Sequence, residues 1–498
     1  MSPCPVEVNT TPKIAIIGGG IAGLSAAWTL EKARRAGQPV EYRLFEAADR
    51  LGGVISSETI DGCVVEGGPD SFLSEKPAAA ALCRELGLAG ELLPSNDRER
   101  KTYIVVRNRL IPLPDGLMFM VPTKLVPTAL TPLFSWSTKL RMAREFVFPP
   151  QPATEDESVA DMTRRHFGQE TVDRLVSPLL SGVYGGSASQ LSVRAVLPRM
   201  VTMEKEHRSL TRAMLAARKT PAPPRQSTSP RSLFTTLRGG MQLMVDGIAA
   251  QLEPGSIHLG MPVDALHHNS IDCSDPKPPD CRYTCGWTLE TAGGQEKFDG
   301  IILALPAWAA ADLLRPVDRL VSDLLSEVPY SSSITVTMGF NMDDLRDLPP
   351  GFGYLVPPTE KRNMLACTFV HAKFAGRTPW DKGVLRCFLG GSGNEHLLDE
   401  PDARLTEIVL QELRAILGLE AKPNFVRITR SRRAMAQYAV GHLDRIQALR
   451  ENVAALPGFA LAGNAYSGIG VPDCIRTGQE AAESVLHALE QQPAPANA

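Results

Sequence analysis

A glycine-rich segment lies near the N-terminus of this chain. Residues 13–23 read KIAIIGGGIAG, in which an apolar run is followed at once by glycines in the spacing G-x-G-x-x-G. The apolar run Lys13–Ile17 predicts a short buried strand, and Gly23–Arg35 predicts a helix. Glu41–Glu46 alternates in polarity and predicts a second strand. This order is the start of a βαβ unit, so we expect an α/β protein with a Rossmann-type parallel sheet.

Each glycine of the motif has a physical role. Gly18 permits the tight turn, Gly20 lets a diphosphate approach the backbone, and Gly23 lets the helix pack closely on the strand. The helix N-terminus offers N–H groups and a positive dipole end to the phosphates. Glu46 lies 23 residues after Gly23, where a carboxylate accepts hydrogen bonds from a ribose. The motif therefore predicts a dinucleotide site, and the carboxylate disfavours a 2′-phosphate.

Two further segments bear on which dinucleotide binds. Residues 46–54 read EAADRLGGV, in which Gly52 and Gly53 let the backbone follow an extended diphosphate, and Arg50 either neutralises that diphosphate or fixes the loop. Residues 461–475 read LAGNAYSGIGVPDCI and predict a strand, a glycine-rich loop and the start of a helix. The N-terminus of that helix is suited to stabilise negative charge on a reduced flavin. The first and last segments would then form one FAD domain.

Composition narrows the class of protein. A chain of 498 residues corresponds to about three domains, and a net charge of −3 gives no reason to expect a nucleic-acid partner. Nine cysteines without a secretory signal indicate a reduced, cytoplasmic setting. The spacing of Cys273, Cys281 and Cys285 fits no common zinc pattern, so we expect unligated thiols and no metal site. No segment is a convincing transmembrane helix.

The middle of the chain predicts other elements. Helical spacing indicates helices over Thr138–Phe148, Ser158–Leu180 and Glu400–Leu417. Short apolar runs at Ile334–Phe340 and Val384–Leu389 indicate a separate sheet.

Five more segments carry a resemblance to a known family. They read EGGPDSF at 66–72, LLSGVYGG at 179–186, HRSL at 207–210, GHLDRI at 441–446 and GIGVPDC at 468–474. With the two glycine-rich ends, the chain from residue 13 to 489 is similar to the bacterial oxygen-dependent protoporphyrinogen/coproporphyrinogen oxidases. These are FAD enzymes of heme biosynthesis in the amine-oxidase-like superfamily.

The resemblance implies three domains and a tail. The FAD-binding domain is built from discontinuous segments, 11–97, 233–310 and 425–490. Residues 98–232 form a mainly helical substrate-channel and membrane-docking domain, and residues 311–424 form an α+β substrate-binding domain. Residues 491–498 are expected to be disordered.

The resemblance also implies which residues surround cofactor and substrate. Lys76 falls where bacterial members carry a lysine close to the substrate channel, although a solvated lysine at a helix start is an equally good interpretation. Lys101, Thr102 and Tyr184 are the other expected substrate contacts. No side chain is expected to act as catalytic acid or base, because the flavin performs the hydride transfer. The residues expected around FAD are Gly18, Gly19, Gly20, Ile21, Ala22, Gly23, Glu46, Ala47, Arg50, Gly52, Gly53, Val54, Gly68, Pro69, Asp70, Ser71, Val263, Gly463, Gly468, Ile469, Gly470, Val471 and Asp473.

Several residues depart from the family pattern. Many bacterial members have a tryptophan near the flavin where this chain has Ser431, and a proline where it has Ala436. Plant-type members hold a propionate with an arginine at the position of Thr102, for which Lys101 or Arg100 is a candidate replacement. Four arginines between residues 427 and 433 are further candidate cations, although such a run is more often a solvated face.

The resemblance implies oxidation of protoporphyrinogen IX or coproporphyrinogen III to the porphyrin. Six electrons would pass through the flavin to O2 and give H2O2. It does not settle which tetrapyrrole is preferred, and it leaves open a homodimer and handover of the product to a heme-pathway chelatase. Two alternative functions also stay open: another FAD amine oxidase or desaturase of the superfamily, and a non-enzymatic carrier on the same fold.

An apolar segment raises the question of membrane contact. Residues 110–134 read LIPLPDGLMFMVPTKLVPTALTPLF, which is proline-rich and nearly uncharged. One interpretation is a lip that dips into the inner face of the cell membrane and receives an apolar macrocycle. The other is a proline-rich channel wall packed on the core.

Overall fold

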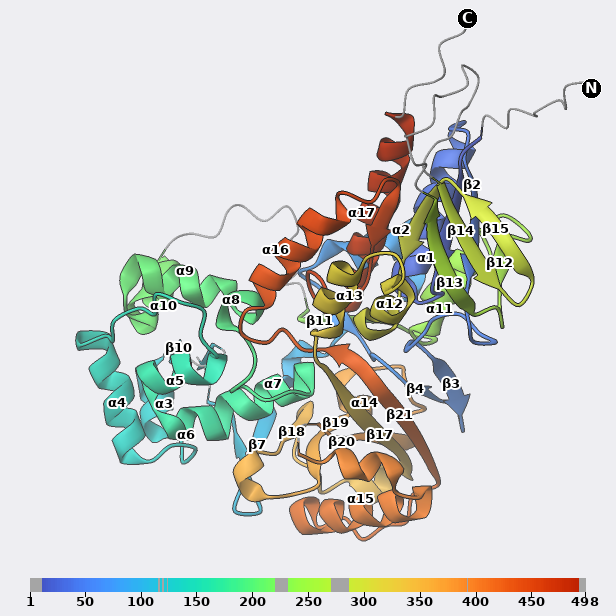
Figure 1. Cartoon of the computed structure of the whole chain (residues 1–498). Helices are drawn as coiled ribbons and strands as arrows, with labels where there is room; N and C mark the ends of the chain where they lie inside the picture. The colour runs from blue at the N-terminus through green and yellow to red at the C-terminus, as the bar shows by residue number, and fades with distance from the viewer. Residues whose placement is uncertain are drawn as a thin grey trace, which may run out of the picture.

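The computed structural model describes residues 11–114, 117–118, 121–122, 124–219, 232–269, 286–391 and 393–491. The three clustered cysteines, Cys273, Cys281 and Cys285, and all but the first residue of the expected tail 491–498 lie outside the described residues. The chain forms a five-stranded parallel sheet, a seven-stranded mixed sheet and a group of helices beside them (Figure 1). This is a mixed α/β fold with several sheets, as the sequence predicts.

The predicted strand–glycine–helix start is confirmed. β1 spans Lys13–Ile17, α1 spans Ile21–Arg35, and β2 (Glu41–Phe45) pairs with β1 in parallel. Four of the five residues of β1 are buried, because helices and a second small sheet cover the two faces of the parallel sheet.

Segments from distant parts of the chain complete this sheet. Its order is β12-β2-β1-β16-β22, in which β16 (Gly300–Leu303) pairs with β1 and β22 (Phe459–Leu461) pairs with β16. The final helix α17 (Val471–Glu490) packs beside α1, where a Cβ on Gly478 would lie 2.1 Å from the Ala22 carbonyl oxygen. The first and last segments of the chain therefore share one sheet, as the two glycine-rich motifs predict.

The seven-stranded sheet stands next to the parallel sheet. Its order is β21-β17-β20-β19-β18-β7-β8, and only β7 and β18 pair in parallel. One face packs against α15 (Asp402–Leu417) through residues such as Val336 of β17 (Tyr330–Asn341) and Cys387 of β20 (Lys382–Gly390). The opposite face turns toward the helices and the parallel-sheet region.

The strand pairing departs from two of the expected domain boundaries. β7 (Thr102–Val106) and β8 (Arg109–Pro112) belong to the seven-stranded sheet. The family resemblance had instead implied that residues 98–232 form the mainly helical domain. β21 (Phe425–Ala436) also belongs to the seven-stranded sheet, although residues 425–490 were grouped with the FAD segments. β21 is an edge strand whose outer positions carry arginines, and this charge masks its strand pattern.

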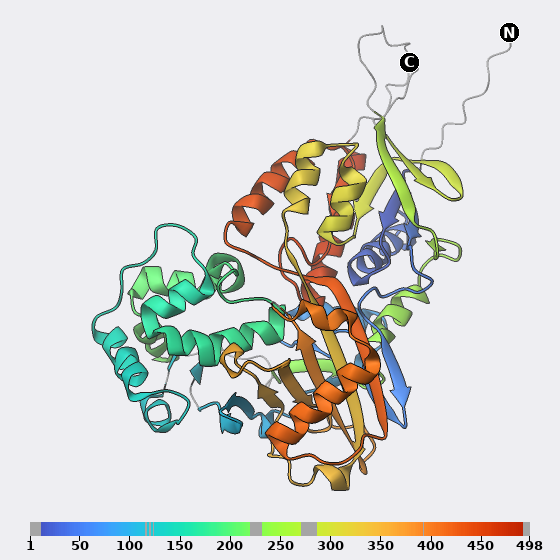
Figure 2. The same ribbon diagram turned by 60° about the horizontal axis from the view of Figure 1, so that its bottom comes forward.

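The helices between residues 125 and 219 gather on one side of the molecule, as Figures 1 and 2 both show. The helix predicted over Ser158–Leu180 is interrupted at Gly168, which has a φ of +89° and ends α5. The chain then passes through α6 and a π-helical turn into α7. The bounds here are α3 (Leu125–Leu130), α4 (Trp136–Val147), α5 (Val159–Phe167), α6 (Gln169–Thr171), the π-turn (Val172–Val176), α7 (Ser177–Tyr184), α8 (Val193–Val196), α9 (Pro198–His207) and α10 (Leu210–Lys219).

The apolar segment 110–134 is divided between core and surface. Leu133 and Phe134 are buried, whereas Val126 and Leu130 of α3 are exposed. In the part of the chain that the structure describes, no helix combines the length and the apolar character needed to cross a bilayer.

The remaining elements connect these layers. The strands are β3 (Ser57–Ile60), β4 (Cys63–Glu66), β5 (Phe72–Leu73), β6 (Leu92–Pro94), β9 (Leu117–Met118), β10 (Val121–Pro122), β11 (Phe234–Leu237), β12 (Ile257–His258), β13 (Val263–Asn269), β14 (Gly286–Thr291), β15 (Gly294–Phe298), β18 (Gly353–Leu355) and β19 (Met364–Phe369). The helices are α2 (Pro77–Glu85), α11 (Gln242–Ala249), α12 (Ala307–Leu314), α13 (Arg319–Ser326), α14 (Val370–Lys373) and α16 (His442–Val453).

Candidate active site

The turn between β1 and α1 has the geometry that the glycine spacing predicts. Gly18 has a φ of +109°, a left-handed conformation that favours glycine, and a Cβ there would lie 2.5 Å from the Ala304 carbonyl oxygen. A Cβ on Gly23 would lie 1.9 Å from the Gly18 carbonyl oxygen. Only glycine therefore allows α1 to begin this close to β1.

Gly20 differs, because neither its backbone nor its neighbours require glycine. Its φ is −71°, and apart from its chain neighbours no described residue has an atom within 4 Å of where a Cβ would lie. Gly20 is the N-cap of α1, and no side chain caps that helix. The open space thus lies beside uncapped N–H groups at a positive dipole end. The residues present therefore fit a phosphate group of a dinucleotide.

A second loop lies against this turn. The Gly52 N–H donates to the Gly19 carbonyl oxygen at 2.9 Å, and Gly20 and Gly52 form an isolated parallel bridge. Val54 follows with its side chain exposed, and a Cβ on Gly68 would lie 1.8 Å from the Val54 carbonyl oxygen. Three of the expected cofactor segments are therefore in contact.

Arg50 fixes the second loop, which is one of the two roles predicted for it. Its guanidinium donates to the carbonyl oxygens of Leu51 at 3.1 Å, Ile55 at 3.0 Å and Gly53. With its hydrogen bonds directed into the loop, Arg50 stabilises the conformation that presents Gly52 and Gly53.

Glu46 lies at the end of β2 beside the glycine turn. Its carboxylate accepts hydrogen bonds from the N–H of Gly19 at 2.6 Å and of Ala48 at 2.8 Å. Its backbone carbonyl accepts from the Met261 N–H at 2.9 Å, so the segment leading to Val263 runs alongside. The structure thus brings Glu46, Ala47 and Val263, the expected ribose and adenine contacts, to one end of the site.

The C-terminal glycine-rich loop closes around an ion pair. The Asp473 carboxylate accepts from the Gly470 N–H at 3.2 Å and from Lys76 Nζ at 2.8 and 2.6 Å. A Cβ on Gly468 would lie 2.3 Å from the Asp473 side chain. Lys76, expected near substrate, therefore has its charge balanced by Asp473 in the first turn of α17, and its contact with substrate stays a prediction.

Tyr438 fixes the same loop from the seven-stranded sheet side. Its hydroxyl accepts a hydrogen bond from the Gly468 N–H at 2.6 Å and donates to the Asn464 carbonyl oxygen at 2.9 Å. Gly463, which begins the loop at a φ of +132°, donates its N–H to Thr477 Oγ1 at 3.1 Å. The loop is held at its start by α17 and at its centre by Tyr438.

Tyr184 brings α7 to this loop. Its ring lies 6.5 Å from the Tyr438 ring, centroid to centroid. Burial and the nearby Asp473 carboxylate raise the pKa of Tyr184 to about 12, so its hydroxyl stays protonated at neutral pH. Its carbonyl oxygen accepts from Ser331 Oγ at 3.0 Å and Gln437 Nε2 at 2.6 Å.

Asp70 faces two cations that the sequence did not single out. Lys373 Nζ lies 3.1 Å from Asp70 Oδ2, Arg386 Nη1 lies 3.9 Å from the same oxygen, and Ser71 Oγ donates to Asp70 Oδ1 at 2.6 Å. Burial alone would raise the pKa of Asp70, but Lys373, Arg386 and the Ser71 hydroxyl together hold it well below its usual range. Asp70 is thus a firmly ionised partner of Lys373, whereas its contact with FAD stays a prediction. In the chain, Pro69 lies between Asp70 and Gly68.

A buried pair joins the same segment to the second sheet. Both terminal nitrogens of Arg377 donate to Glu66 Oε1, at 2.7 and 2.6 Å, and one donates to Thr236 Oγ1 at 2.6 Å. The Arg377 side chain is only 1% exposed and that of Glu66 3%. This pair fixes the start of the EGGPDSF segment against the chain that leads into β20.

A row of cross-strand neighbours connects Thr102 with Arg386. Thr102 pairs with Gly353, Gly353 with Thr368, and Thr368 with Arg386. Directly paired residues lie on one face of a sheet. Arg386 Nη2 on this face donates to the Gly68 carbonyl oxygen, so the face meets the predicted cofactor segment. Lys101, just before β7, is exposed at the outer end of this row.

The arginine run on β21 points mainly to solvent. Three of its members are paired with carboxylates, Arg427 with Glu58, Arg430 with Asp402 and Arg432 with Asp399, and Arg433 lies over the Trp308 ring at 4.5 Å. These contacts agree with the solvated-face interpretation. Ser431 pairs with Ser333, and the buried Ala436 pairs with Tyr330.

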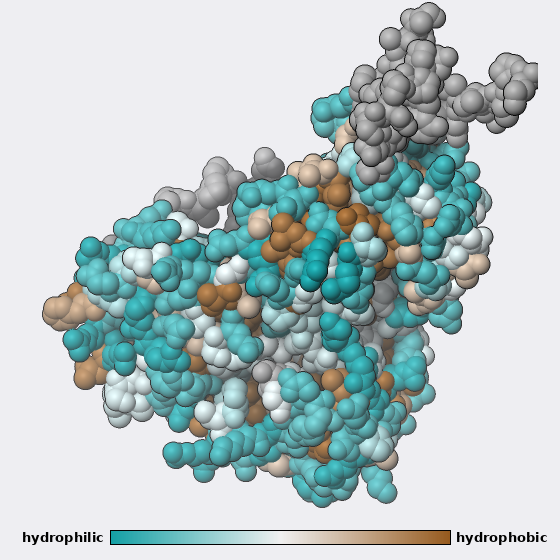
Figure 3. Space-filling model, viewed as in Figure 1, coloured by the Kyte–Doolittle hydropathy of each residue, from teal (hydrophilic) through white to brown (hydrophobic). Residues whose placement is uncertain are grey.

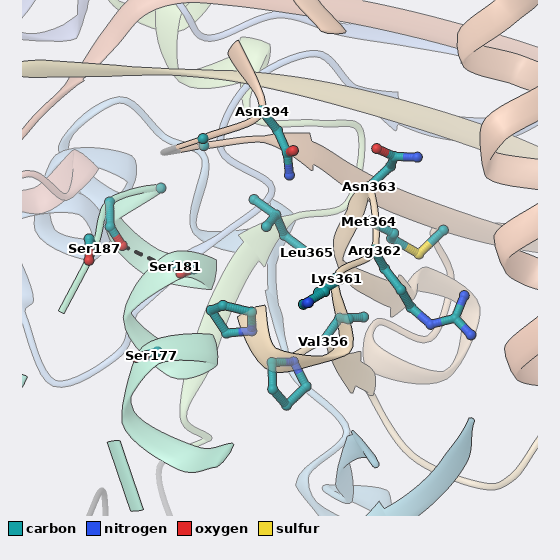
Figure 4. Close-up of a pocket in the computed structure, with 16 residues that line it drawn as sticks. Ser177, Ser181, Ser187, Val356, Lys361, Arg362, Asn363, Met364, Leu365 and Asn394 are labelled. Carbon is teal, nitrogen blue, oxygen red and sulfur yellow. Dashed lines mark hydrogen bonds between the residues drawn. The ribbon is translucent and has the colours of Figure 1, made fainter. Parts of the chain in front are cut away.

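A cavity of about 430 Å³ opens beyond Tyr184, between α7 and the turn that joins β18 to β19 (Figure 4). Ser177 and Ser181 line it from α7, and Lys361, Arg362 and Asn363 line it from the turn. No sequence pattern indicates this cavity, because the residues named on its two walls lie 180 or more positions apart in the chain.

Lys373, Arg377 and Arg386 were not predicted from the sequence. Arg386 stands within the apolar strand run VLRCFL at 384–389, and a charged residue inside a buried strand is a signal that could have revealed it. Lys373 and Arg377 lie in a short helix and the turn after it, where no periodicity marks them. Within the described ranges, no group of three or more His, Cys, Asp or Glu side chains is arranged to hold a metal ion.

Similarity to known proteins extends over almost the whole chain. Residues 21–486 match the flavin-containing amine oxidoreductases. The coproporphyrinogen III oxidase of Bacillus subtilis (strain 168) is 34% identical over 476 residues, which cover 95% of this chain and 97% of that protein. The protoporphyrinogen oxidase 2, chloroplastic/mitochondrial, of Arabidopsis thaliana is 26% identical, with 97% and 96% covered. A crystal structure from Exiguobacterium sp. 255-15, provisionally named a protoporphyrinogen oxidase, has a TM-score of 0.83 at 32% identity, covering 96% of this chain and 99% of that one.

Proposed function

The chain belongs to the flavin-containing amine oxidoreductase family, and from this premise we propose that it oxidises a porphyrinogen to the porphyrin in heme biosynthesis. The observation that carries the proposal is the similarity over almost the whole chain to the coproporphyrinogen III oxidase of Bacillus subtilis (strain 168), at 34% identity. In the structure, the buried Arg386 lies beside Phe388 and is held by Asp70 and by the Gly68 carbonyl oxygen. Arg386 therefore orders the segment that adjoins the glycine-rich turn.

The reaction is an oxidation without group transfer. Six electrons and six protons leave the porphyrinogen, and three molecules of O2 accept them as three molecules of H2O2. When bound, FAD supplies the two-electron chemistry of each step.

The residues of this chain bind, orient and balance charge. The N-terminus of α1 beside Gly20 would hold the diphosphate, and the Glu46 carboxylate would accept hydrogen bonds from the ribose. Tyr438 holds the loop before α17, and the Lys76–Asp473 pair sets the charge at the start of that helix. The Tyr184 hydroxyl, with a pKa raised to about 12, is a hydrogen-bond donor at neutral pH and not a base.

The experiment that tests this function follows porphyrin fluorescence and oxygen uptake together. Purified protein reconstituted with FAD is mixed with coproporphyrinogen III or protoporphyrinogen IX, and the spontaneous rate is subtracted. We expect catalysed oxidation of at least one, with three O2 consumed per porphyrin. Anaerobic bleaching of the flavin by an amine but by neither porphyrinogen would instead support another oxidase of the superfamily. Failure to bind FAD would support a carrier.

We also propose that α3 and α4 dock the protein on a lipid surface. Val126 and Leu130 of α3, and Trp136 and Leu140 of α4, are each at least 69% exposed. Figure 3 shows apolar side chains at the left edge of the molecule, where Figure 1 places α4. The basic residues Lys139, Arg141 and Arg144 on α4 suit anionic headgroups.

A further inference from the structure

The cavity between α7 and the β18–β19 turn has the lining of an anion site. Its volume of about 430 Å³ is within the range of small-molecule sites. The polar residues Ser177, Ser181, Asn363 and Asn394 line it, together with two cationic residues, Lys361 and Arg362. The described residues that line it include no aspartate or glutamate.

The two cations differ in their availability. Arg362 donates to Glu412 of α15 and to Asn108, so its charge is balanced. Lys361 is exposed and has no ion pair with any residue in the described ranges. Figure 4 shows Lys361 directed toward α7 and Arg362 directed away from it. Lys361 is therefore the cation that this cavity offers to a ligand.

The C-terminal end of α7 does not oppose an anion here, although the dipole end of a helix C-terminus is negative. The Tyr184 carbonyl oxygen already accepts hydrogen bonds from Ser331 and Gln437. The Gly185 N–H donates to the Ser181 carbonyl oxygen at 2.9 Å, and Ser181 Oγ donates to the Gly186 carbonyl oxygen at 3.4 Å. Two of the last four carbonyl groups of the helix, those of Ser181 and Tyr184, therefore already accept hydrogen bonds.

The cavity is also close to the candidate active site. Gly185 and Gly186 line it directly after Tyr184, whose ring lies beside that of Tyr438. Val356 and Leu365 give it an apolar wall opposite the serines. An apolar ring carrying carboxylates on flexible arms matches this division into apolar and cationic parts.

We propose that this cavity receives a carboxylate-bearing edge of the tetrapyrrole, with Lys361 as the cation that pairs with the carboxylate. The inference rests on the proposed function and deepens it. A tetrapyrrole with carboxylates on two neighbouring rings presents charge at one edge, whereas one with carboxylates on all four rings presents charge at a second edge too. We place this second edge in the cavity, so Lys361 meets a carboxylate only in the four-carboxylate substrate and favours it over the two-carboxylate substrate.

The test measures porphyrin binding to the flavin-loaded protein by fluorescence quenching, with coproporphyrin III and protoporphyrin IX as probes. In K361Q we expect the affinity for coproporphyrin III to fall by about three- to tenfold, the size expected for one partly exposed charge-assisted contact. The affinity for protoporphyrin IX should change by less than about twofold. K361R should restore binding of coproporphyrin III, and K422Q, at an exposed lysine outside the cavity, should match the wild type.

Three results would overturn the inference: wild-type affinity of K361Q for coproporphyrin III, an equal loss for both porphyrins, or an equal loss in K422Q. Wild-type protein that binds neither porphyrin would overturn it as well. Measuring porphyrinogen oxidation separates the proposed function from the proposed carboxylate site at Lys361. If Lys361 governs binding of coproporphyrin III but neither porphyrinogen is oxidised, the proposed function fails while the carboxylate site stands. If porphyrinogens are oxidised and K361Q is unchanged, only the site fails.

Discussion

Lys76 Nζ lies 2.8 and 2.6 Å from the two carboxylate oxygens of Asp473, although the residues are 397 positions apart. Lys76 precedes α2, and Asp473 lies in the first turn of α17. A carboxylate at a helix N-terminus is favoured by the dipole, and the lysine balances its charge. The pair therefore sets the net charge at the helix end that the sequence places next to the flavin.

Removing one member of this pair should shift the flavin reduction potential in a direction set by the lost charge. K76M leaves Asp473 unbalanced, which disfavours negative charge on the reduced flavin, so its potential should fall by about 10–20 mV, or roughly 0.5–1 kcal/mol for a partly exposed pair. D473N should raise it by a similar amount, and the double variant should lie between them. Spectroscopic redox titration measures all four proteins. Equal shifts of one sign in both single variants would contradict this account.

Gly20 and Gly23 should respond differently to the same substitution. G20A meets no described atom and keeps an allowed φ, so the apoprotein should keep its thermal stability while FAD affinity falls about tenfold or more. G23A would place a Cβ 1.9 Å from the Gly18 carbonyl oxygen and should destabilise the apoprotein by about 2–4 kcal/mol. Thermal unfolding without FAD and FAD titration by fluorescence separate the two effects. A G20A protein that binds FAD as tightly as the wild type would contradict the phosphate assignment.

Two buried tyrosines beside the C-terminal loop differ in whether the hydroxyl forms a hydrogen bond, so one variant can serve as the control for the other. The Tyr438 hydroxyl bridges Gly468 and Asn464, whereas the Tyr466 hydroxyl is buried with no hydrogen-bond partner among the described residues. Y438F should therefore lose about 1–3 kcal/mol of unfolding free energy, because the Gly468 N–H loses its partner. Y466F should be neutral or slightly stabilising. Denaturant unfolding measures both, and an equal loss in the two variants would show that the loop contact is not the cause.

The features that the sequence predicts well are local ones. The strand Lys13–Ile17, the turn at Gly18 and the helix α1 follow from residues within one short segment, where each glycine has its own steric reason. The C-terminal strand, loop and helix follow by the same reasoning. Turn geometry and periodicity are encoded by neighbours along the chain, so they can be recognised without knowledge of the fold.

What the sequence does not predict depends on contacts between distant segments. The cations that face Asp70 come from positions 373 and 386, and no pattern links them to it. β21 lies at the edge of a sheet, where exposed arginines dominate its composition. The pairing of Lys76 with Asp473 could not be foreseen either, because only the packing of α17 beside α2 brings them together.

His166 should make stability depend on pH. Its ring is fully buried, with Nδ1 3.0 Å from Glu145 Oε1 and Nε2 2.8 Å from Glu204 Oε1. Burial lowers its pKa, but these two carboxylates overcome that effect and raise the pKa above the usual value. Arg165 also faces the ring and pairs with Glu204 and Glu157.

The sign of the effect follows from the direction of each shift. The His166 contribution is fully present below its unfolded pKa of about 6.5, and it is lost as pH rises through the higher folded value. The pKa values of Glu145 and Glu204 are lowered despite burial, so their contributions are lost as pH falls through those lower values. Thermal stability should therefore decrease as pH rises above 6.5 and through the raised folded pKa of His166. H166Q should lose this alkaline decrease and be less stable throughout, while H267Q, at a half-exposed histidine, should keep the wild-type profile.

The exposed apolar stripe on α4 should determine binding to lipid vesicles. Trp136 and Leu140 lie one helical turn apart and are 77% and 73% exposed, so replacing both with serine removes apolar area without opening the core. Burying one such side chain contributes about 1.5–3 kcal/mol, so the double variant should lose at least about tenfold in partitioning to vesicles with anionic headgroups. W380S is the control, because Trp380 is 90% exposed but precedes β20 in the seven-stranded sheet. Vesicle sedimentation measures all three proteins.

Binding should also weaken as salt is raised, since Lys139, Arg141 and Arg144 contribute through charge. Unchanged binding by the W136S/L140S protein, or an equal loss in W380S, would remove α4 as the docking surface.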